Sequence, residues 1–176
     1  MLEEFRRKCA HFYIKRNLLK KETSPISFNK IVSSSQEILI VMPEDDADYS
    51  NCFDIIRYFQ IHKKNITLFI SEFRYNSIPG KEKFSFISFH PDQVTWFFLP
   101  NSNLKQRITG KSFDLVLDLN RKENTFFSAI SNFVTSKIRL GFNKNRSEGY
   151  CNLLFNCKQD DSAAAYFNLL NYIRMF

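Results

Sequence analysis

Apolar and polar positions along the chain follow two periods, one typical of strands and one typical of helices. Short apolar or half-alternating runs predict strands at residues 37–42, 65–71, 84–90, 94–100, 113–120, 137–142 and 150–157. Between several of these runs, apolar residues recur at helical spacing and predict helices that begin at Asp48 or Ser50, at Asn101, near Lys122 and at Asp161. Repeated strand–helix–strand units predict a Rossmann-like α/β fold, in which helices cover both faces of a doubly wound, mainly parallel sheet in three layers.

The first 24 residues predict a basic amphipathic helix in front of one Rossmann-like α/β domain, which comprises residues 25–176. The apolar residues of this segment recur every three or four positions and would form one stripe, made of Leu2, Phe5, Cys9, Phe12, Tyr13 and Leu19. Two interpretations are open. The stripe can pack the helix against its own domain, with the basic side chains solvated. Alternatively, the helix can dock on an anionic partner, which would be RNA phosphates or an acidic membrane surface.

Basic residues are concentrated in this N-terminal segment. The whole chain has a formal net charge of +7, and residues 1–30 contain eight lysines and arginines against three glutamates. The side chains expected to bind an anionic partner are Arg6, Arg7, Lys8, Lys15, Arg16, Lys20 and Lys21. A protein complex could present such a partner, and nothing in the pattern predicts the readout of a DNA sequence.

Composition and length favour one folded domain without a zinc site or a cofactor. A chain of 176 residues with 44% hydrophobic residues can bury a sizeable core, in which we place Trp96. The four cysteines are scattered, and the three histidines do not lie near them at zinc-ligand spacing. No apolar run approaches the roughly 20 residues that span a bilayer, and the N-terminus lacks the apolar core of a signal peptide. We therefore expect a cytoplasmic protein that can bind peripherally to the inner membrane.

Four acids follow the first predicted strand: Glu44, Asp45, Asp46 and Asp48. Carboxylates beside a helix N-terminus are stabilised by the helix dipole, which is the structural interpretation of this turn. The alternative is a magnesium site that Asp45 and Asp46 share with Asp118, at the end of the strand "FDLVLDLN", because hard cations favour several carboxylate oxygens.

Three segments, "EILIVMPEDDADYSNCFDIIRYF", "FDLVLDLN" and "KIRLGF", resemble in order and spacing the landmarks of the N-terminal, acceptor-side half of family 9 glycosyltransferases, the heptosyltransferases with a GT-B fold. The resemblance covers residues 37–142 and implies that Asp48 lies where the family has a catalytic base toward the acceptor hydroxyl. Ala47 stands where the family has glycine. The chain is also similar to short stand-alone bacterial proteins that carry this half-domain.

The sequence lacks the parts with which these enzymes bind a nucleotide-sugar. No two of its four glycines lie close enough for a glycine-rich phosphate loop, and no second domain is recognisable. Our main hypothesis is a non-catalytic binding or adaptor protein that docks through the N-terminal helix. One alternative is a glycosyltransferase component that supplies the acceptor-binding half and Asp48. Another is a small regulatory domain that binds a nucleotide or a metal ion at the acidic turn.

Overall fold

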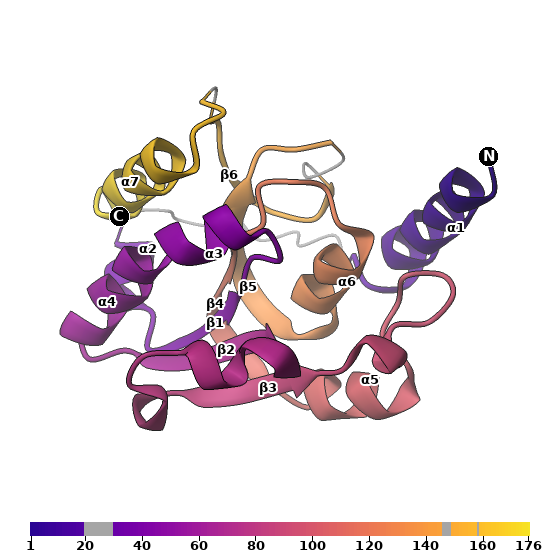
Figure 1. Cartoon of the computed structure of the whole chain (residues 1–176), viewed down its shortest axis with the longest axis horizontal. Helices are drawn as coiled ribbons and strands as arrows, with labels where there is room; N and C mark the ends of the chain where they lie inside the picture. Colours follow the sequence, from indigo (N-terminus) through magenta and orange to yellow (C-terminus); the bar gives the residue numbers. More distant parts are fainter. Residues whose placement is uncertain (20–29, 146–148, 158) are drawn as a thin grey trace.

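The computed structural model describes residues 1–19, 30–145, 149–157 and 159–176, and its central feature is a parallel sheet (Figure 1). Within these residues six strands pair in the order β3-β2-β1-β4-β5-β6, and every pair is parallel. The strands are β1 (Glu37–Val41), β2 (Asn65–Ser71), β3 (Ser85–Phe89), β4 (Ser112–Asp118), β5 (Thr135–Phe142) and β6 (Leu153–Phe155). This order is that of a doubly wound Rossmann-like sheet, so the predicted fold class is confirmed. From β1 the chain adds β2 and β3 on one side of the sheet and then β4, β5 and β6 on the other, so the direction of winding reverses between β1 and β4.

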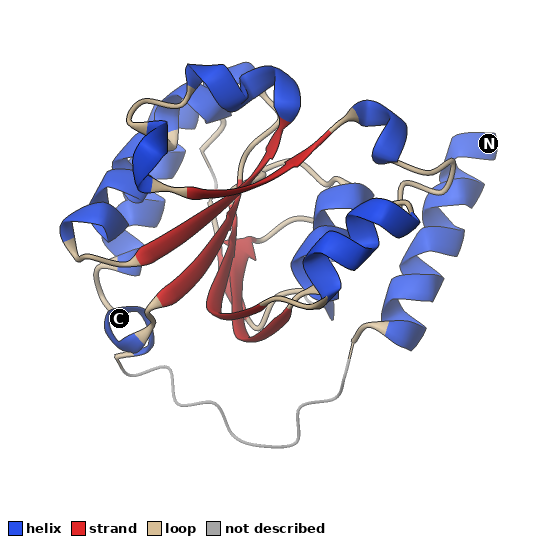
Figure 2. Cartoon of the chain, turned by 90° about the horizontal axis from the view of Figure 1, so that it is seen from below, coloured by secondary structure: helices blue, strands red, loops and turns tan. Residues whose placement is uncertain are grey.

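Helices cover both faces of the sheet (Figure 2). Side chains alternate between the faces along a strand, so Ile38 and Ile40 of β1 join one apolar cluster and Leu39 and Val41 join the other. Helices α4 (Phe53–Ile61) and α7 (Ser162–Ile173) bury the first cluster, and α5 (Ser102–Thr109) and α6 (Thr125–Phe133) bury the second. Because both faces are buried, β1 reads as a continuous apolar run in the sequence.

The helix predicted after β1 is divided into α3 (Asp46–Asn51) and α4, which meet at Cys52. It also begins earlier than predicted. Asp45 is the N-cap, and its Oδ1 accepts hydrogen bonds from the backbone N–H groups of Ala47 and Asp48 at 3.0 and 3.3 Å. A short helix, α2 (Ile31–Ser34), precedes β1 and was not predicted.

The connection between β2 and β3 contains only short 3₁₀ turns, η1 (Glu72–Ser77) and η2 (Lys81–Lys83), and the connection after β3 begins with a third, η3 (Pro91–Gln93), before it reaches α5. The strand predicted at residues 94–100 is wrong, because only Val94 and Pro100 pair, as an isolated bridge. The chain reverses between them at Phe98, whose φ is +56°. This reversal carries Trp96 to the surface, where it is 52% exposed, so its assignment to the core is also wrong.

The N-terminal helix, α1 (Leu2–Asn17), lies beside α6 and the reversal at residues 94–100 (Figure 1). It packs through Ala10, His11 and Ile14, and Tyr13 and Leu19 are partly buried beside them. The prediction that α1 packs on the domain through its whole apolar stripe is wrong, because three members of the stripe, Leu2, Phe5 and Phe12, are exposed. The domain instead buries the opposite side of α1, where Ile14 joins the apolar cluster that includes α6 and His11 contacts Glu123 and Thr125 at the start of α6. Within the described residues, no helix combines the length and apolarity needed to cross a membrane.

Candidate functional site

At the end of β4, Asp118 forms a buried ion pair with a lysine that follows β5. Its Oδ2 accepts a hydrogen bond from Lys144 Nζ at 2.6 Å, and both side chains are less than a tenth exposed. Its Oδ1 accepts from the backbone N–H and the side-chain Nδ2 of Asn120, at 3.0 and 2.9 Å. Asn120 also donates to the carbonyl of Met42 and accepts from the N–H of Glu44. Through Asp118 and Asn120, the end of "FDLVLDLN" is therefore hydrogen-bonded to the segments that follow β1 and β5.

Asp48 is also buried, at 1% exposure, and faces the protein interior. Its Oδ1 accepts from Arg121 Nε and from Ser162 Oγ, both at 2.7 Å. Arg121 donates further to the carbonyls of Gln159 and Asp160. These bonds connect α3 to the turn after β4 and to the start of α7, which is the geometry of a structural carboxylate. A catalytic role for Asp48 stays a prediction.

Asp45 and Asp46 are also paired with cations from other elements, whereas the Glu44 carboxylate accepts a hydrogen bond from Asn124 Nδ2. Asp45 Oδ2 lies 2.7 Å from Lys122 Nζ, and this hydrogen bond lowers the pKa of Asp45 below its usual value. Asp46 Oδ1 lies 2.6 Å from Arg74 Nη2, in the turn after β2. Among the described residues, no group of three or more His, Cys, Asp or Glu side chains is arranged to hold a metal ion. The structure therefore gives no support to the magnesium site proposed for Asp45, Asp46 and Asp118.

Sequence reasoning found these acids, and Lys144 as a cation at the end of a strand, but missed the pairing of the acids with Arg74, Arg121, Lys122 and Lys144. A signal was present in the sequence. All four cations follow a predicted strand within a few residues, and the carboxyl ends of parallel strands meet at one edge of a sheet. Cations and acids placed there are expected to pair.

The cations of α1 are divided between two faces. Arg6 and Arg7 turn toward the domain: the Arg6 guanidinium lies 4.4 Å from the centre of the Trp96 ring, and its Nε donates to the Trp96 carbonyl at 2.5 Å. Lys8, Lys15 and Arg16 are exposed. We call the exposed side chains of Leu2, Phe5, Lys8, Phe12, Lys15 and Arg16 the outer face of α1. Lys20 and Lys21, predicted for the same role, lie outside the described residues.

One buried histidine, which sequence reasoning did not single out, anchors α1 from its inner side. His11 Nδ1 is hydrogen-bonded to the Tyr150 hydroxyl, and Nε2 lies 3.2 Å from Glu123 Oε1 and 3.4 Å from Thr125 Oγ1. The rings of His11 and Tyr150 are also stacked. These contacts join α1 to the start of α6 and to the segment before β6, so the outer face is held in a defined orientation.

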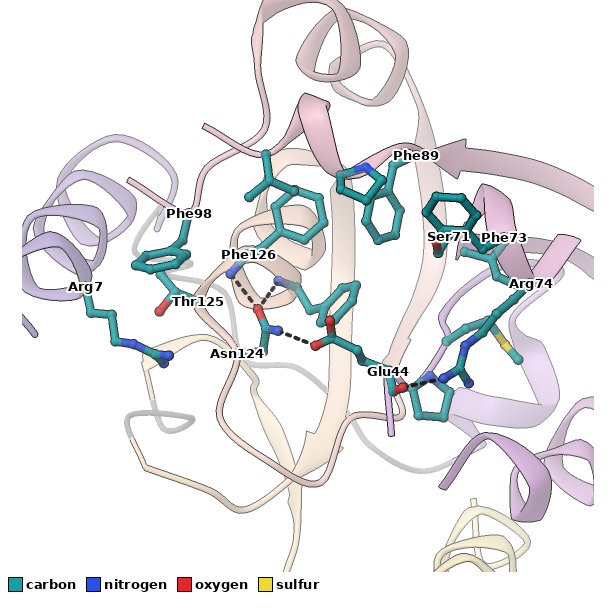
Figure 3. Close-up of a pocket in the computed structure, with 16 residues that line it drawn as sticks. Arg7, Glu44, Ser71, Phe73, Arg74, Phe89, Phe98, Asn124, Thr125 and Phe126 are labelled. Carbon is teal, nitrogen blue, oxygen red and sulfur yellow. Dashed lines mark hydrogen bonds between the residues drawn. The ribbon is translucent and has the colours of Figure 1, made fainter. Parts of the chain in front are cut away.

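A pocket of about 480 Å³ opens at the C-terminal ends of β1, β2 and β3, and we call it the strand-end pocket (Figure 3). Five phenylalanines and two prolines line it, and two of these phenylalanines belong to the start of α6. Arg7 reaches it from α1, and Arg74 lies on the opposite side in Figure 3, with Glu44 and Asn124 between them. Ligands of open α/β sheets bind at this edge.

Comparison with known proteins assigns the chain to a family but gives no activity. A model described as "Family of unknown function (DUF6913)" matches residues 6–176. No curated protein and no solved structure gives a significant match. The resemblance to family 9 glycosyltransferases therefore stays a prediction, and function has to be inferred from the geometry of the surface and the pocket.

Proposed function

Because this chain belongs to the DUF6913 family, whose function is unknown, we propose its function from its surface: it is a non-catalytic adaptor that docks to an anionic membrane surface through the outer face of α1. The observation that carries the proposal is the orientation of α1. Its inner face is anchored by Ala10, His11 and Ile14, whereas Leu2, Phe5 and Phe12 point away from the domain. Because α1 is already folded and held in place, its exposed apolar side chains can contact a membrane surface without a change in the fold.

The charge of α1 supports an anionic surface as the partner. Residues 2–17 contain five cations and two glutamates, a net charge of +3, and the outer face carries Lys8, Lys15 and Arg16 beside its apolar side chains. In an interfacial helix, apolar side chains enter the headgroup–acyl boundary while flanking cations meet anionic headgroups.

A membrane accounts for the outer face better than RNA does. RNA would use the cations and could stack bases on Phe5 and Phe12, but it would leave the aliphatic side chain of Leu2 in water. A lipid surface would cover the side chains of Leu2, Phe5 and Phe12 together. Trp96, in the reversal at residues 94–100, lies against Arg6 of α1 and is half-exposed. Tryptophan is enriched at membrane–water interfaces.

The acids at the sheet edge support the non-catalytic part of the proposal. Asp48 and Asp118 are buried, and each already accepts short hydrogen bonds from a cation. A general base must reach the proton that it removes, and these two carboxylates face the interior.

Vesicle binding of the full chain tests the proposal. We expect binding to vesicles of phosphatidylcholine with phosphatidylglycerol, no binding to pure phosphatidylcholine, and a blue shift of Trp96, the single tryptophan. Raising the salt from about 0.1 M to 1 M should weaken binding, because the screening length falls from about 10 Å to 3 Å. The double variant Phe5→Ser, Phe12→Ser should bind at least about tenfold more weakly, since burying a phenylalanine contributes about 1.5–3 kcal/mol.

Phe167→Ser is the matched control, because Phe167 is as exposed as Phe12 but lies on α7. It should bind like the wild type. Equal losses in the control and the double variant would contradict the proposal. So would binding of single-stranded RNA without binding of either kind of vesicle.

A further inference from the structure

We propose that the strand-end pocket binds a small planar aromatic molecule that carries a carboxylate or a phosphate. This site is separate from the outer face of α1 and does not depend on docking. Its volume of about 480 Å³ lies within the range of about 300–1,000 Å³ that is usual for pockets of small ligands.

The wall of the pocket favours a flat ring. It includes Phe73, Phe89, Phe98 and Phe126, together with Pro43 and Pro91. Behind the wall, Phe89 stacks on Phe69 with ring centroids 5.0 Å apart, and its ring centroid is also 5.0 Å from that of Phe126. Rings held by their neighbours in this way form rigid surfaces. Aromatic pairs prefer offset-stacked or edge-to-face contacts, which a planar ligand can make with such walls.

Arg7, at one side of the pocket, can bind a negatively charged group. Its Nε and Nη2 both donate to one oxygen of Glu3, at 3.2 and 2.8 Å, so the guanidinium keeps further N–H donors. Its side chain is 37% exposed, and its Cζ lies 5.3 Å from the centre of the Phe98 ring. Arginine has only donors, which a carboxylate or a phosphate matches with two acceptor oxygens.

Arg74, at the other side, adds a second cation (Figure 3). It donates to the Glu44 carbonyl and to Asp46, and its guanidinium lies 4.4 Å from the centre of the Tyr49 ring. Its Nη1 is buried and has no hydrogen-bond partner among the residues that the structure describes. Buried polar atoms usually have one, and exceptions are frequent at functional sites. Because this atom is buried, it does not face the open part of the pocket, so Arg74 contributes its positive charge to the pocket wall rather than a free donor.

The start of α6 does not hold the anion. Asn124 Oδ1 already accepts from the N–H groups of Phe126 and Phe127, at 3.0 and 3.4 Å, and Asn124 Nδ2 donates to Glu44 Oε2 at 3.0 Å. The first N–H groups of the helix are thus occupied by its own cap. The anionic group of the ligand must therefore meet the arginines, and Arg7 makes α1 a part of the binding site.

Binding of naphthalene probes to the full chain tests the inference. Calorimetry would compare 2-naphthoate and 2-naphthyl phosphate with 2-naphthamide, which has the same ring without the charge. We expect at least one of the two anions to bind more tightly than the amide. The tighter of the two shows whether the site prefers a carboxylate or a phosphate. Arg7→Gln should weaken the tighter anion at least tenfold and leave the amide nearly unchanged. Ser71→Phe, which places a ring inside the pocket, should abolish all binding.

Lys8→Gln is the matched control, because Lys8 is next to Arg7, is paired in the same way with Glu4, and does not line the pocket. It should bind all probes like the wild type. Failure of both anions to bind would overturn the inference, and so would amide binding as tight as that of the anions. Equal losses in Arg7→Gln and Lys8→Gln would also overturn it. None of these outcomes bears on vesicle binding.

Discussion

At the residue scale, the charged side chains at the carboxyl edge of the sheet join neighbouring elements. Asp48 connects α3 to the turn after β4, and Asp118 connects that turn to the one after β5. Both acids are visible in the sequence, and so are the cations. Their pairing is not visible, because the partners lie 26 and 73 positions away and meet only through the order of the strands.

Asp114, in β4, provides a pH-dependent test of such a connection. Its Oδ2 accepts from the backbone N–H groups of Gln36 and Glu37, at 2.8 and 2.9 Å, and these bonds lower its pKa below the usual 3.8. A carboxyl with a lowered pKa contributes its full stability above the ordinary pKa and loses it as the pH falls through the folded-state value. Asp114→Asn should therefore lower the free energy of unfolding by about 1 kcal/mol at pH 7.

The difference between wild type and Asp114→Asn should shrink as the pH falls below about 4, since the carboxyl then takes up a proton, first in the unfolded chain and at lower pH in the folded protein. Urea unfolding at a series of pH values measures it. Asp54→Asn is the control: Asp54 is exposed and pairs with Arg57 on the same helix, so its replacement should cost under about 0.5 kcal/mol. A difference that stays constant between pH 7 and pH 3 would show that the charge of Asp114 is not involved.

At the scale of elements, period and capping explain where helices and strands lie, but not which face they bury. The predicted α1 exists, yet its larger apolar side chains are outside and Ala10 and Ile14 are inside. The start of α3 shows how far a local signal reaches, because acids were expected beside a helix N-terminus but the cap was expected at Asp48 or Ser50. The cap is Asp45, whose own carboxylate accepts from the first N–H groups of the helix.

Gly141, in β5, tests how tightly β5 packs against Cys151, in the segment before β6, and against the end of β4. A methyl group there would lie 3.1 Å from Cys151 Sγ and 3.5 Å from Asp118 Cβ. Burial raises the pKa of Cys151 to about 12, so the thiol is neutral at pH 7 and behaves as an apolar neighbour. Gly141→Ala should lower the unfolding free energy by about 1–3 kcal/mol through overpacking, which thermal unfolding would detect.

Two further variants show whether the loss of stability in Gly141→Ala comes from the contact with Cys151. Gly110→Ala meets no atom within 4 Å and should be neutral within about 0.5 kcal/mol. In a Cys151→Ala background, Gly141→Ala should cost less than it does alone, because the close contact is gone. An unchanged cost in that background would mean that Cys151 is not the obstacle.

At the scale of the whole molecule, α1 belongs to the packed structure. Ile14 joins the apolar cluster under α5 and α6, His11 is bonded to the start of α6, and Arg7 completes the strand-end pocket. The helix therefore has an inner role in packing and an outer role in the proposed docking.

Deleting residues 1–17 should consequently destabilise the protein. Removal of Ala10, His11 and Ile14 uncovers apolar surface on α6, and we expect a loss of about 2–4 kcal/mol, by analogy with large-to-small replacements in a core. In a protein of this size the melting temperature would fall by about 4–16 °C. The double variant Phe5→Ser, Phe12→Ser should melt like the wild type, since both rings are exposed. A truncated protein that melts with the full chain would contradict the packing role.

The sequence alone determined the fold class, most strands and helices, and the basic α1, because hydrophobic period, capping residues and charge are local properties. Only the tertiary structure decided the order of the strands, the pairing of Asp48 and Asp118 with cations, the face that α1 buries and the existence of the strand-end pocket. Each of these depends on contacts between segments far apart in the chain. Trp96 shows the limit most directly: its neighbours read as a buried strand, but a reversal at Phe98 leaves it at the surface. Local periodicity gives a segment its secondary structure, whereas the elements packed around it decide which side chains meet.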